Sequence, residues 1–505
     1  MIAALALIQS VNLPNASQPA IIAFAAFYFV VVAIIGAWAT RRTRTAADFF
    51  VAGQGIGLLA LTLSAMSATL SGFAFIGGPG LVYTVGLGAM FLLLPASITN
   101  SMGAWVLAKR MRLLAEVRPV MTVPDAIGAR YNSRLAQGLS GVGILVAAMG
   151  YMGSQMLALG FVIDAIFNTG LVAGIWIGMA ITLAYSVAGG IVAGIYTDVF
   201  QGALMALASV LVFLFVLDVG GGMSGISQTI LAADPEFLGP WGKLGPVAAL
   251  SFFFVFGVGS LGQPHVVHKF YMLRDPRMLR FYPLLVTAAL LVTMLLYFGV
   301  GVAVKSLVVN GQLQPLVVAD NATPVFLLRF TPVLLAALVF SGVAAAIMST
   351  VNSFMNIGAA VVTHDLPTAF GRPLGNELAW GRVSTVLLSV GAAAIAQFSG
   401  QLIAFLGIFG WGLFASTLVP ALAIGLNWKG ATRAGAVASI STGLGITLVC
   451  GTLVDFLKLY RFPAGVTVSG ISLVASILVF FAVSAMTRAG GGDDIDEDIR
   501  LIMEV

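Results

Sequence analysis

Two apolar stretches of the chain carry residue types that could bind a small cation. In one of them, Ser349, Thr350, Asn352 and Ser353 place side-chain oxygens within about one helical turn of each other. Hard cations prefer hydroxyl and carbonyl oxygens, and a monovalent ion that must leave again needs no carboxylate. The pattern predicts a Na⁺ site; the alternative is that the hydroxyls bond back to carbonyls of their own helix.

The other stretch, residues 63–80, is apolar enough for a membrane helix but holds too many helix-breaking residues to be one smooth helix. These residues are Gly72, Gly77, Gly78, Pro79 and Gly80. Because an unpaired backbone group in lipid costs several kcal/mol, a break survives only where other groups satisfy it. Such a break offers carbonyls and half-helix ends to an ion or a solute, so we predict that this stretch is half of a transport site.

Residues 251–265 are interrupted in the same way, by Gly257, Gly259, Gly262 and Pro264. Two Gly/Pro-broken helices in corresponding places of two halves indicate an inverted-repeat transporter with its site between the halves. Five predicted spans separate the starts of the two segments, as a five-plus-five repeat requires. The alternative is that these glycines only let helices pack closely.

Asp198 is the carboxylate with the strongest functional indication, because it lies at or just inside the end of an apolar span. An ionisable group in a membrane span is a functional hypothesis by default; the alternative is an interfacial Asp that caps a helix. We place no Lys or Arg in the middle of a span, and we interpret His265, His268 and Lys269 as residues of the inner membrane boundary. These histidines lack the third ligand that a metal site needs.

Composition places the whole chain in a membrane. It is 60% hydrophobic and 9% charged over 505 residues, against roughly 25% charged residues in soluble domains. The single cysteine, Cys450, excludes an intramolecular disulfide and a cysteine metal cluster within one chain. The net charge of +5 does not by itself indicate nucleic acid. We find no nucleotide-binding motif and no nucleophile–base pair, so we expect no enzyme, no catalytic residue and no cofactor beyond Na⁺ as coupling ion.

Windows of about 20 apolar residues predict thirteen membrane-spanning helices. They cover residues 20–40, 54–80, 85–108, 136–163, 169–188, 192–217, 245–265, 282–304, 332–357, 380–398, 401–427, 434–454 and 464–487. If the N-terminus is outside, every Lys and Arg falls on the inner side except Lys243, Lys305, Arg329, Lys458 and Arg461. This positive-inside bias predicts a multi-pass protein of the plasma (inner) membrane with a cytoplasmic C-terminus.

The predicted spans divide the chain into segments. Residues 1–50 hold an external leader, the first span and an inner loop, 51–217 the first five-span repeat, 218–244 an external loop, 245–430 the second five-span repeat, 431–487 two additional spans, and 488–505 an acidic cytoplasmic tail. We interpret the tail as solvated chain.

These motifs give the chain a resemblance to a known family. The three stretches above, together with Tyr196-Thr-Asp-Val-Phe-Gln201 and Gly262-Gln-Pro-His265, resemble the sodium:solute symporter family, which includes proline, pantothenate, glucose and sialic-acid carriers. The likeness runs from about residue 45 to about residue 430, and residues 75–80 and 345–352 are most similar to the pantothenate branch. The resemblance implies an all-α, leucine-transporter-like fold with ten core spans after one extra N-terminal helix.

The resemblance also implies a sodium site. Its ligands would be the backbone carbonyls of Ser67, Leu70 and Ala346 and the hydroxyls of Ser349 and Thr350. In the proline branch an aspartate stands where this chain has Thr69, so a formal charge near the ion is missing here.

Further sodium positions are implied along the exit path. The family places Asp198 on the inner sodium exit path and, in some members, in a second sodium site. That second site would use Asn352 and Ser353 in this chain, where those members have serines.

For the solute, the resemblance implies an aromatic pocket. Phe73, Tyr151 and Phe256 match positions that line the pocket in the proline branch, and their small or polar neighbours are Ser71, Gly72, Ser154 and Gln155. An aromatic-lined pocket with a few placed polar groups suits a small organic solute. The alternative for the phenylalanines is packing in the core or against lipid.

Together these inferences predict Na⁺-coupled uptake of a small organic solute by alternating access. The carrier would work as a monomer in the lipid bilayer, without a nucleic-acid partner. Pantothenate, a monocarboxylate or an amino acid such as proline are the expected solutes. A proton-coupled carrier of the same fold and a membrane sensor or channel that has lost transport are the alternatives.

Overall fold

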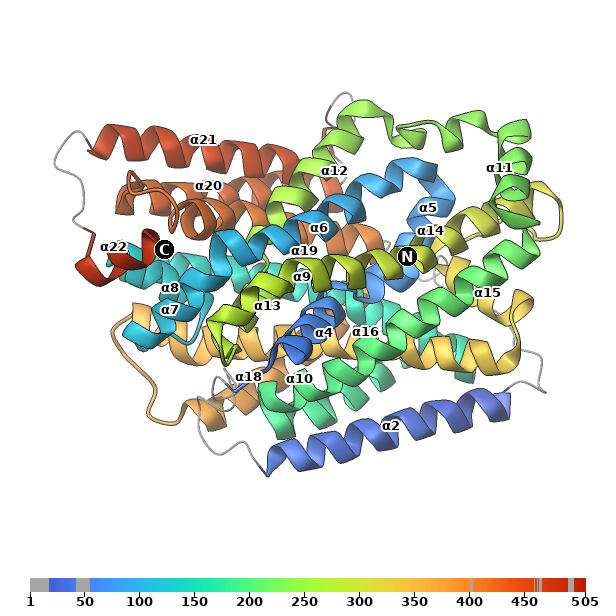
Figure 1. Ribbon diagram of the computed structural model, residues 1–505, viewed down its shortest axis with the longest axis horizontal. Coiled ribbons are helices and arrows are strands. Elements are labelled where there is room, and N and C mark those ends of the chain that lie inside the picture. The colour runs from blue at the N-terminus through green and yellow to red at the C-terminus, as the bar shows by residue number, and fades with distance from the viewer. Residues whose placement is uncertain are drawn as a thin grey trace.

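The computed structural model describes residues 18–41, 55–399, 403–457, 459–460, 462, 466–488 and 495–505. In this part of the chain the longer helices lie roughly along the long axis of a single bundle (Figure 1). The α-helices are α2 (Gln18–Thr40), α4 (Leu58–Thr69), α5 (Gly78–Val85), α6 (Met90–Gly103), α7 (Lys109–Val117), α8 (Val123–Tyr131), α9 (Arg134–Phe167), α10 (Leu171–Val219), α11 (Gly222–Ala233), α12 (Gly245–Gly259), α13 (Pro264–Val267), α14 (Tyr282–Val309), α15 (Ala322–Phe330), α16 (Val333–Ala360), α17 (Leu366–Ala369), α18 (Glu377–Phe398), α19 (Ile403–Leu418), α20 (Arg433–Gly451), α21 (Val468–Arg488) and α22 (Glu497–Met503).

Eleven helical segments of the described residues are long and apolar enough to cross a membrane. The number thirteen is therefore not confirmed, and two of the predicted spans explain the difference. The span predicted at 54–80 is split after α4, and its second half continues into the segment Phe73–Val117. The spans predicted at 169–188 and 192–217 lie in one helical element, α10, whose described residues give the span Gly194–Val219 and the shorter apolar helix Leu171–Ala184.

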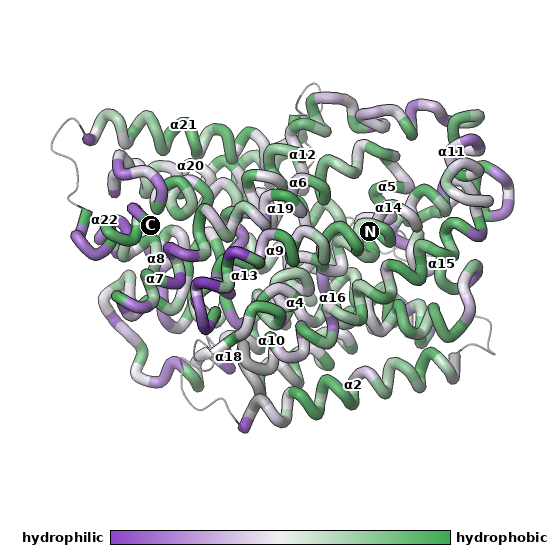
Figure 2. Tube along the Cα trace, viewed as in Figure 1, coloured by the Kyte–Doolittle hydropathy of each residue, from purple (hydrophilic) through white to green (hydrophobic). Residues whose placement is uncertain are grey.

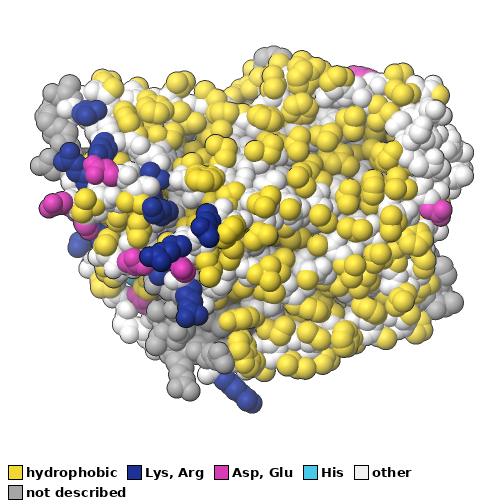
Figure 3. Space-filling view, viewed as in Figure 1, with side chains coloured by type: hydrophobic (Ala, Val, Ile, Leu, Met, Phe, Trp, Pro, Cys, Tyr) yellow, Lys and Arg dark blue, Asp and Glu magenta, His cyan; other side chains and the backbone are white. Residues whose placement is uncertain are grey.

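Polar residues gather at the two ends of the bundle, and the helices between the ends are mainly hydrophobic (Figure 2). Most Lys and Arg side chains visible in Figure 3 lie at one end, beside α7, α8 and α22, and we call this the basic end. The helices α11 and α15 lie at the opposite end (Figure 1). The separation of charge along the bundle axis agrees with the charge asymmetry read from the sequence.

The acidic tail does not match its interpretation as solvated chain. Helix α22 contacts α7 at the basic end, and Ile499, Ile502 and Met503 are buried. Arg118 donates to Asp498 at 2.7 Å, which holds the pKa of that carboxyl below its usual value. The tail is docked because its apolar residues recur at helical spacing and its acidic residues meet the cations of this end.

The centre of the bundle is formed by five helices. Helix α10 packs against α16, α9 and α4, and α19 packs against α9. Segments far apart in sequence therefore meet there, as the positions of α4, α9 and α16 in Figure 1 show. All predicted binding residues lie on or next to these helices or on α12.

Candidate functional site

The first broken segment opens between α4 and the π-helix η2 (Phe73–Gly77). Helix α4 ends at Thr69, and Leu70 leaves helical geometry with φ −90° and ψ 89°. The break thus precedes the Gly77–Gly80 cluster, which lies inside helical structure. These glycines serve close packing instead: a Cβ on Gly80 would lie 2.7 Å from the carbonyl oxygen of Ala319.

The second broken segment opens at Gln263. Helix α12 runs through Gly257 and Gly259, a short 3₁₀ turn follows, and Gln263 is extended with φ −78° and ψ 106° before Pro264 starts α13. Proline at the first helical position fits this restart, because its missing N–H would have had no helical partner there. Both predicted breaks are therefore present, each within the predicted stretch.

Two of the predicted sodium ligands, Ala346 and Thr350, lie where the end of α4 faces α16. The Thr350 hydroxyl donates to the carbonyl oxygens of Ala68 at 3.2 Å and Ala346 at 3.0 Å. The carbonyls at the end of a helix, such as that of Ser67, receive no hydrogen bond from a following helical amide, and they form the negative end of the helix dipole. Thr69 donates to the carbonyl of Ala65 in its own helix at 2.8 Å.

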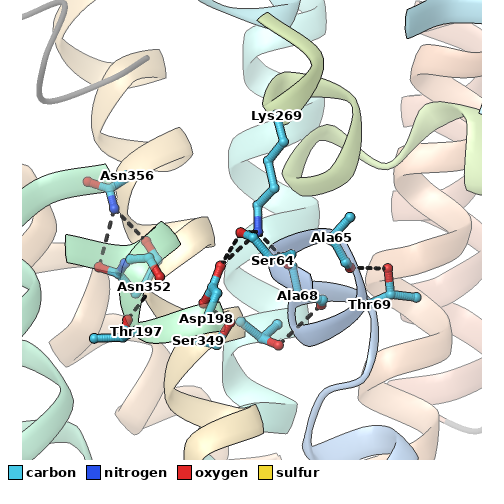
Figure 4. Close-up of polar contacts among 12 residues, drawn as sticks. Ser64, Ala65, Ala68, Thr69, Thr197, Asp198, Lys269, Ser349, Asn352 and Asn356 are labelled. Atoms are coloured by element: carbon cyan, nitrogen blue, oxygen red, sulfur yellow. Dashed lines mark hydrogen bonds and ion pairs between the residues drawn. The ribbon is translucent and has the colours of Figure 1, made fainter. Parts of the chain in front are cut away.

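Asp198 is the centre of a buried polar cluster (Figure 4). Its carboxylate accepts hydrogen bonds from Ser64 at 2.5 Å and from Ser349, and it forms an ion pair with Lys269 at 2.9 Å. The four side chains come from α10, α4, α16 and the 3₁₀ helix η8 (His268–Met272). The exposed fractions of Asp198 and Lys269 are 1% and 2%. Because both charges are buried, this cluster is not a surface contact, and buried paired charges are more typical of functional sites than of protein surfaces.

The position of Lys269 corrects the interpretation that it lies at the membrane boundary. The segment after α13 folds back along α4, because Ile56 donates to Met272 at 3.0 Å and accepts from Arg274 at 2.9 Å. This pairing carries the Lys269 side chain into the bundle. The sequence shows only that Lys269 follows the second break within about two helical turns, and this spacing does not decide between burial in the bundle and a place at the membrane boundary.

The residues predicted for a second sodium site are placed differently. Asn352 accepts from Asn356 through its carbonyl and side-chain oxygens, at 2.9 and 3.2 Å. Within the described residues, the hydrogen bonds of Asp198 go to Ser64, Ser349 and Lys269 and not to Asn352 or Ser353. Asn352 and Ser353 are both buried on α16, but the structure does not join them to Asp198.

Polar groups predicted for the solute form one chain of hydrogen bonds across the first break. The Gly72 amide donates to Gln155 Oε1 at 2.7 Å, and Gln155 Nε2 donates to Ser154 at 2.9 Å. Ser71 and the Tyr151 hydroxyl are 3.2 Å apart and share a hydrogen bond. Helix α9 thus satisfies the backbone and side-chain groups that the break leaves open, as a break inside a membrane requires.

Aromatic rings enclose the same region. Phe73 and Phe256 stack with their centroids 6.1 Å apart, and Trp411 stacks on the other side of Phe256 at 5.1 Å. Tyr151 contacts Phe354 at 5.0 Å between ring centroids. His265 joins the two groups, because its ring centroid lies 6.2 Å from that of Tyr151 and 6.3 Å from that of Trp411. Trp411 and Phe354 are members that the sequence reasoning missed.

Several buried polar atoms beside these rings have no hydrogen-bond partner among the described residues. They are Ser67 Oγ, Gln263 Oε1, both ring nitrogens of His265 and Trp411 Nε1. His265 is 1% exposed, so its interpretation as an interfacial residue is wrong. A buried polar group without a partner costs about 1–3 kcal/mol, so these atoms are candidates for contacts with a polar solute or an ion.

Comparisons with known proteins identify the family of the chain. The model of the sodium:solute symporter family matches residues 49–443. The chain belongs to the sodium:solute symporter family. It is accordingly a multi-pass membrane transporter that couples a small solute to Na⁺, and not an enzyme.

Similar proteins extend this family match over most of the chain. The osmoregulated proline transporter OpuE of Bacillus subtilis is 27% identical over 92% of this chain and 94% of its own length. The sodium/proline symporter of Escherichia coli is 27% identical over 93% and 95%. Among solved structures, a Na⁺-coupled sialic acid symporter superposes with a TM-score of 0.75 at 17% identity, covering 92% of this chain and 98% of its own. The transporter Mhp1 superposes with a TM-score of 0.55. These likenesses show the leucine-transporter-like fold.

Near the end of the symporter opposite to the basic end, Asp320 lies buried between α14 and α15. Its carboxylate accepts from the Ile403 amide at 3.1 Å, and burial raises its pKa to about 7, although that hydrogen bond lowers it. Thr323 donates to the Phe75 carbonyl at 2.6 Å, so this segment covers the first broken helix.

Asp320 should make the stability of the folded symporter depend on pH. A raised folded-state pKa stabilises the fold at low pH, and this contribution is lost as pH rises from the ordinary value near 4 to about 7. Between pH 5 and pH 8 the loss amounts to about 2.5 kcal/mol, at about 1.4 kcal/mol per pH unit. We expect Asp320→Asn to remove this part of the pH dependence of the unfolding temperature. Parallel pH curves for the variant and the original protein would contradict the prediction.

Proposed function

We propose that this symporter takes up a small zwitterionic solute, with proline or a similar amino acid as the first candidate, together with Na⁺. Proline transporters are among its similar proteins over more than nine-tenths of the chain. The aromatic enclosure around Phe73, Phe256 and Trp411 suits a compact, partly apolar molecule. The unpartnered nitrogens of His265 and Trp411 supply hydrogen-bonding groups for its polar end.

The proposed sodium ligands are the carbonyls of Ser67, Leu70 and Ala346 and the hydroxyls of Ser349 and Thr350. The observation that carries this assignment is the Thr350 hydroxyl, which bridges the end of α4 and the carbonyl of Ala346. A hydroxyl that donates to a carbonyl keeps lone pairs on its oxygen for a cation. The proposed site is thus formed by oxygen ligands from α4 and α16.

The proposed mechanism follows from this position. Na⁺ bound between α4 and α16 ties the first broken helix to α16, which holds Ser71, Gly72 and the aromatic groups in the arrangement that binds solute. Opening toward the basic end separates the two helices, so the ion loses ligands and leaves past Asp198. Binding energy for Na⁺ therefore favours the solute-binding form, which is the condition for coupling.

We further propose the orientation and organisation predicted from the sequence. The basic end faces the cytoplasm of a plasma (inner) membrane, the N-terminus is outside, and the protein functions as a monomer. Two five-span repeats, 51–217 and 245–430, each begin with a broken helix. The charge separation along the bundle (Figure 3) supports the orientation, and the two observed breaks support the repeats.

Uptake into liposomes tests the function. With purified protein and an inward Na⁺ gradient we expect accumulation of radiolabelled proline, and replacement of external Na⁺ by choline should reduce it to background. Uptake that is unchanged in choline would exclude sodium coupling. If proline is not accumulated, thermal-shift screening of amino acids, pantothenate and small monocarboxylates with Na⁺ present identifies the solute.

A paired substitution tests the ligand assignment in the same assay. Ser349→Ala combined with Thr350→Ala should raise the Na⁺ concentration for half-maximal uptake at least about tenfold, since two ligands of a weakly bound ion are lost and about 1.4 kcal/mol corresponds to tenfold. Thr363→Ala on the following π-helix is a matched control, because among the described residues its hydroxyl bonds only to the carbonyl of Ala359, one turn earlier, at 2.7 Å.

A further inference from the structure

The ammonium group of Lys269 is surrounded by oxygen atoms. Its Nζ lies 2.7 Å from the Ser64 carbonyl oxygen, 2.7 Å from the Ser64 hydroxyl and 2.9 Å from Asp198 Oδ2 (Figure 4). An ammonium has three N–H donors, so these three acceptors satisfy it. Carbonyl, hydroxyl and carboxylate oxygens are also the ligand types that hard metal cations prefer. The ammonium therefore occupies a position that has the ligands of a metal-cation site.

This oxygen cluster adjoins the proposed sodium site. Ser349, a proposed sodium ligand, donates to Asp198, and its neighbour Thr350 bonds to the end of α4. Helices α4 and α16 contribute to both clusters, and α10 adds Asp198. A cation bound at either cluster thus acts on the same two helices.

Charge limits the cluster to a single cation. Asp198 is the only acidic side chain that the described residues bring into contact with Lys269, and both side chains are almost fully buried. With the ammonium in place the cluster is neutral. A metal ion at the same oxygens would add a second positive charge within a few ångströms, at low dielectric, where like charges repel strongly.

We propose that the Lys269 ammonium is a tethered cation that fills a second cation site formed by the carbonyl and hydroxyl oxygens of Ser64 and the carboxylate of Asp198. By filling it, Lys269 prevents Na⁺ from binding there and sets the number of Na⁺ ions bound in each transport cycle. The proposal rests on the proposed sodium function, because a tethered cation matters only if free Na⁺ binds elsewhere on the same helices.

Lys269→Met tests the proposal directly. Methionine keeps the unbranched stem of lysine but ends one atom earlier, so the position of the ammonium is vacated and Asp198 keeps its charge. We expect the purified variant to bind one more Na⁺ than the original protein in equilibrium binding of ²²Na⁺. Because a ligand that binds only the folded form stabilises it, Na⁺ should also raise the unfolding temperature of this variant more than that of the original protein, and choline should not.

Two further variants provide the controls. Lys269→Arg retains a tethered cation and should bind no additional Na⁺. The double variant Asp198→Asn, Lys269→Met removes both charges, so it should fold without the ion pair and show neither the additional Na⁺ nor the additional thermal shift. If Lys269→Met is unstable without Na⁺, a rise of its unfolding temperature on addition of Na⁺, but not of choline at the same concentration, supports the proposal equally.

The results distinguish failure of this proposal from failure of the proposed function. An original protein that binds no Na⁺, or whose Na⁺ binding survives Thr350→Ala unchanged, contradicts the proposed sodium site. An original protein that binds Na⁺ at Thr350, with a Lys269→Met variant that binds the same number of ions, overturns the tethered-cation proposal alone.

Discussion

Asp198→Asn is expected to destabilise the folded protein by about 3–5 kcal/mol, the cost typical of breaking a buried ion pair by removing one partner. Asparagine keeps the size of the side chain and one acceptor oxygen but leaves the Lys269 ammonium without a negative charge. Lys269 is 2% exposed and cannot reach water without opening the helices around it. The measurement is the unfolding temperature in detergent at a fixed heating rate, because unfolding of such proteins is generally irreversible.

The result should be reversed in part by a second substitution. Lys269→Met in the Asp198→Asn background removes the unpaired charge, and a pair of apolar and neutral polar groups of similar volume is often no less stable than a buried ion pair. Asp498→Asn is the control at the protein surface: its partner Arg118 is 26% exposed, and exposed ion pairs contribute about 1 kcal/mol or less. If Asp198→Asn and Asp498→Asn lowered the unfolding temperature equally, this would contradict a buried ion pair between Asp198 and Lys269.

The existence of the two breaks could be predicted from the sequence, but their positions could not. Glycine, proline and serine in an apolar stretch are incompatible with one smooth membrane helix, and both breaks lie within the stretches predicted for them. The first break, however, is at Leu70 rather than at the glycines 77–80. Glycine permits both a break and a close helix contact, and only the packing partner decides between them. For Gly80 that partner is Ala319, which is more than 200 residues away along the chain.

Lys269 shows why one half of the candidate site was not predictable. The sequence places it after the second break, where a hydropathy window reads it as the end of a span. Its burial depends on the backbone pairing of Ile56 with Met272, a contact between two distant segments that has no local sequence signal. Ser349 and Thr350, in contrast, lie in the middle of an apolar helix, where hydroxyl groups are few, and their position beside α4 could be predicted.

The docked tail had a local signal that was too weak to decide. Ile499, Ile502 and Met503 recur at helical spacing, but a helix of about seven residues is not stable by itself in water. Its stability comes from contact with α7 and from the pairs of Arg118 with Asp496 and Asp498. The acidic composition alone is equally typical of a solvated tail.

Gly72→Ala is expected to reduce solute uptake by about tenfold to a hundredfold. A Cβ at this position would lie 2.6 Å from Ala158 Cβ and 2.8 Å from Ile347 Cγ1, so α9 and α16 would have to move away from the first break. Overpacking of this kind costs about 1–3 kcal/mol, and each 1.4 kcal/mol corresponds to a factor of ten. The Gly72 backbone has helical angles, φ −53° and ψ −26°, that alanine adopts freely. Initial rates of Na⁺-driven uptake in liposomes, normalised to reconstituted protein, measure the effect.

Gly72→Ala should reduce uptake more than other glycine substitutions because the Gly72 amide also donates a hydrogen bond to Gln155. The added methyl group would lie 3.1 Å from Gln155 Oε1, which accepts from the Gly72 amide, so it separates the two groups that close the break. Gly103→Ala is the matched control, because its nearest neighbour would be the Phe270 ring at 3.7 Å, an ordinary contact. Full uptake by Gly72→Ala would mean that the transporting protein does not hold α9 and α16 against the break. The hydrogen-bonded chain from Gly72 to Ser154 would then not be the solute-binding arrangement.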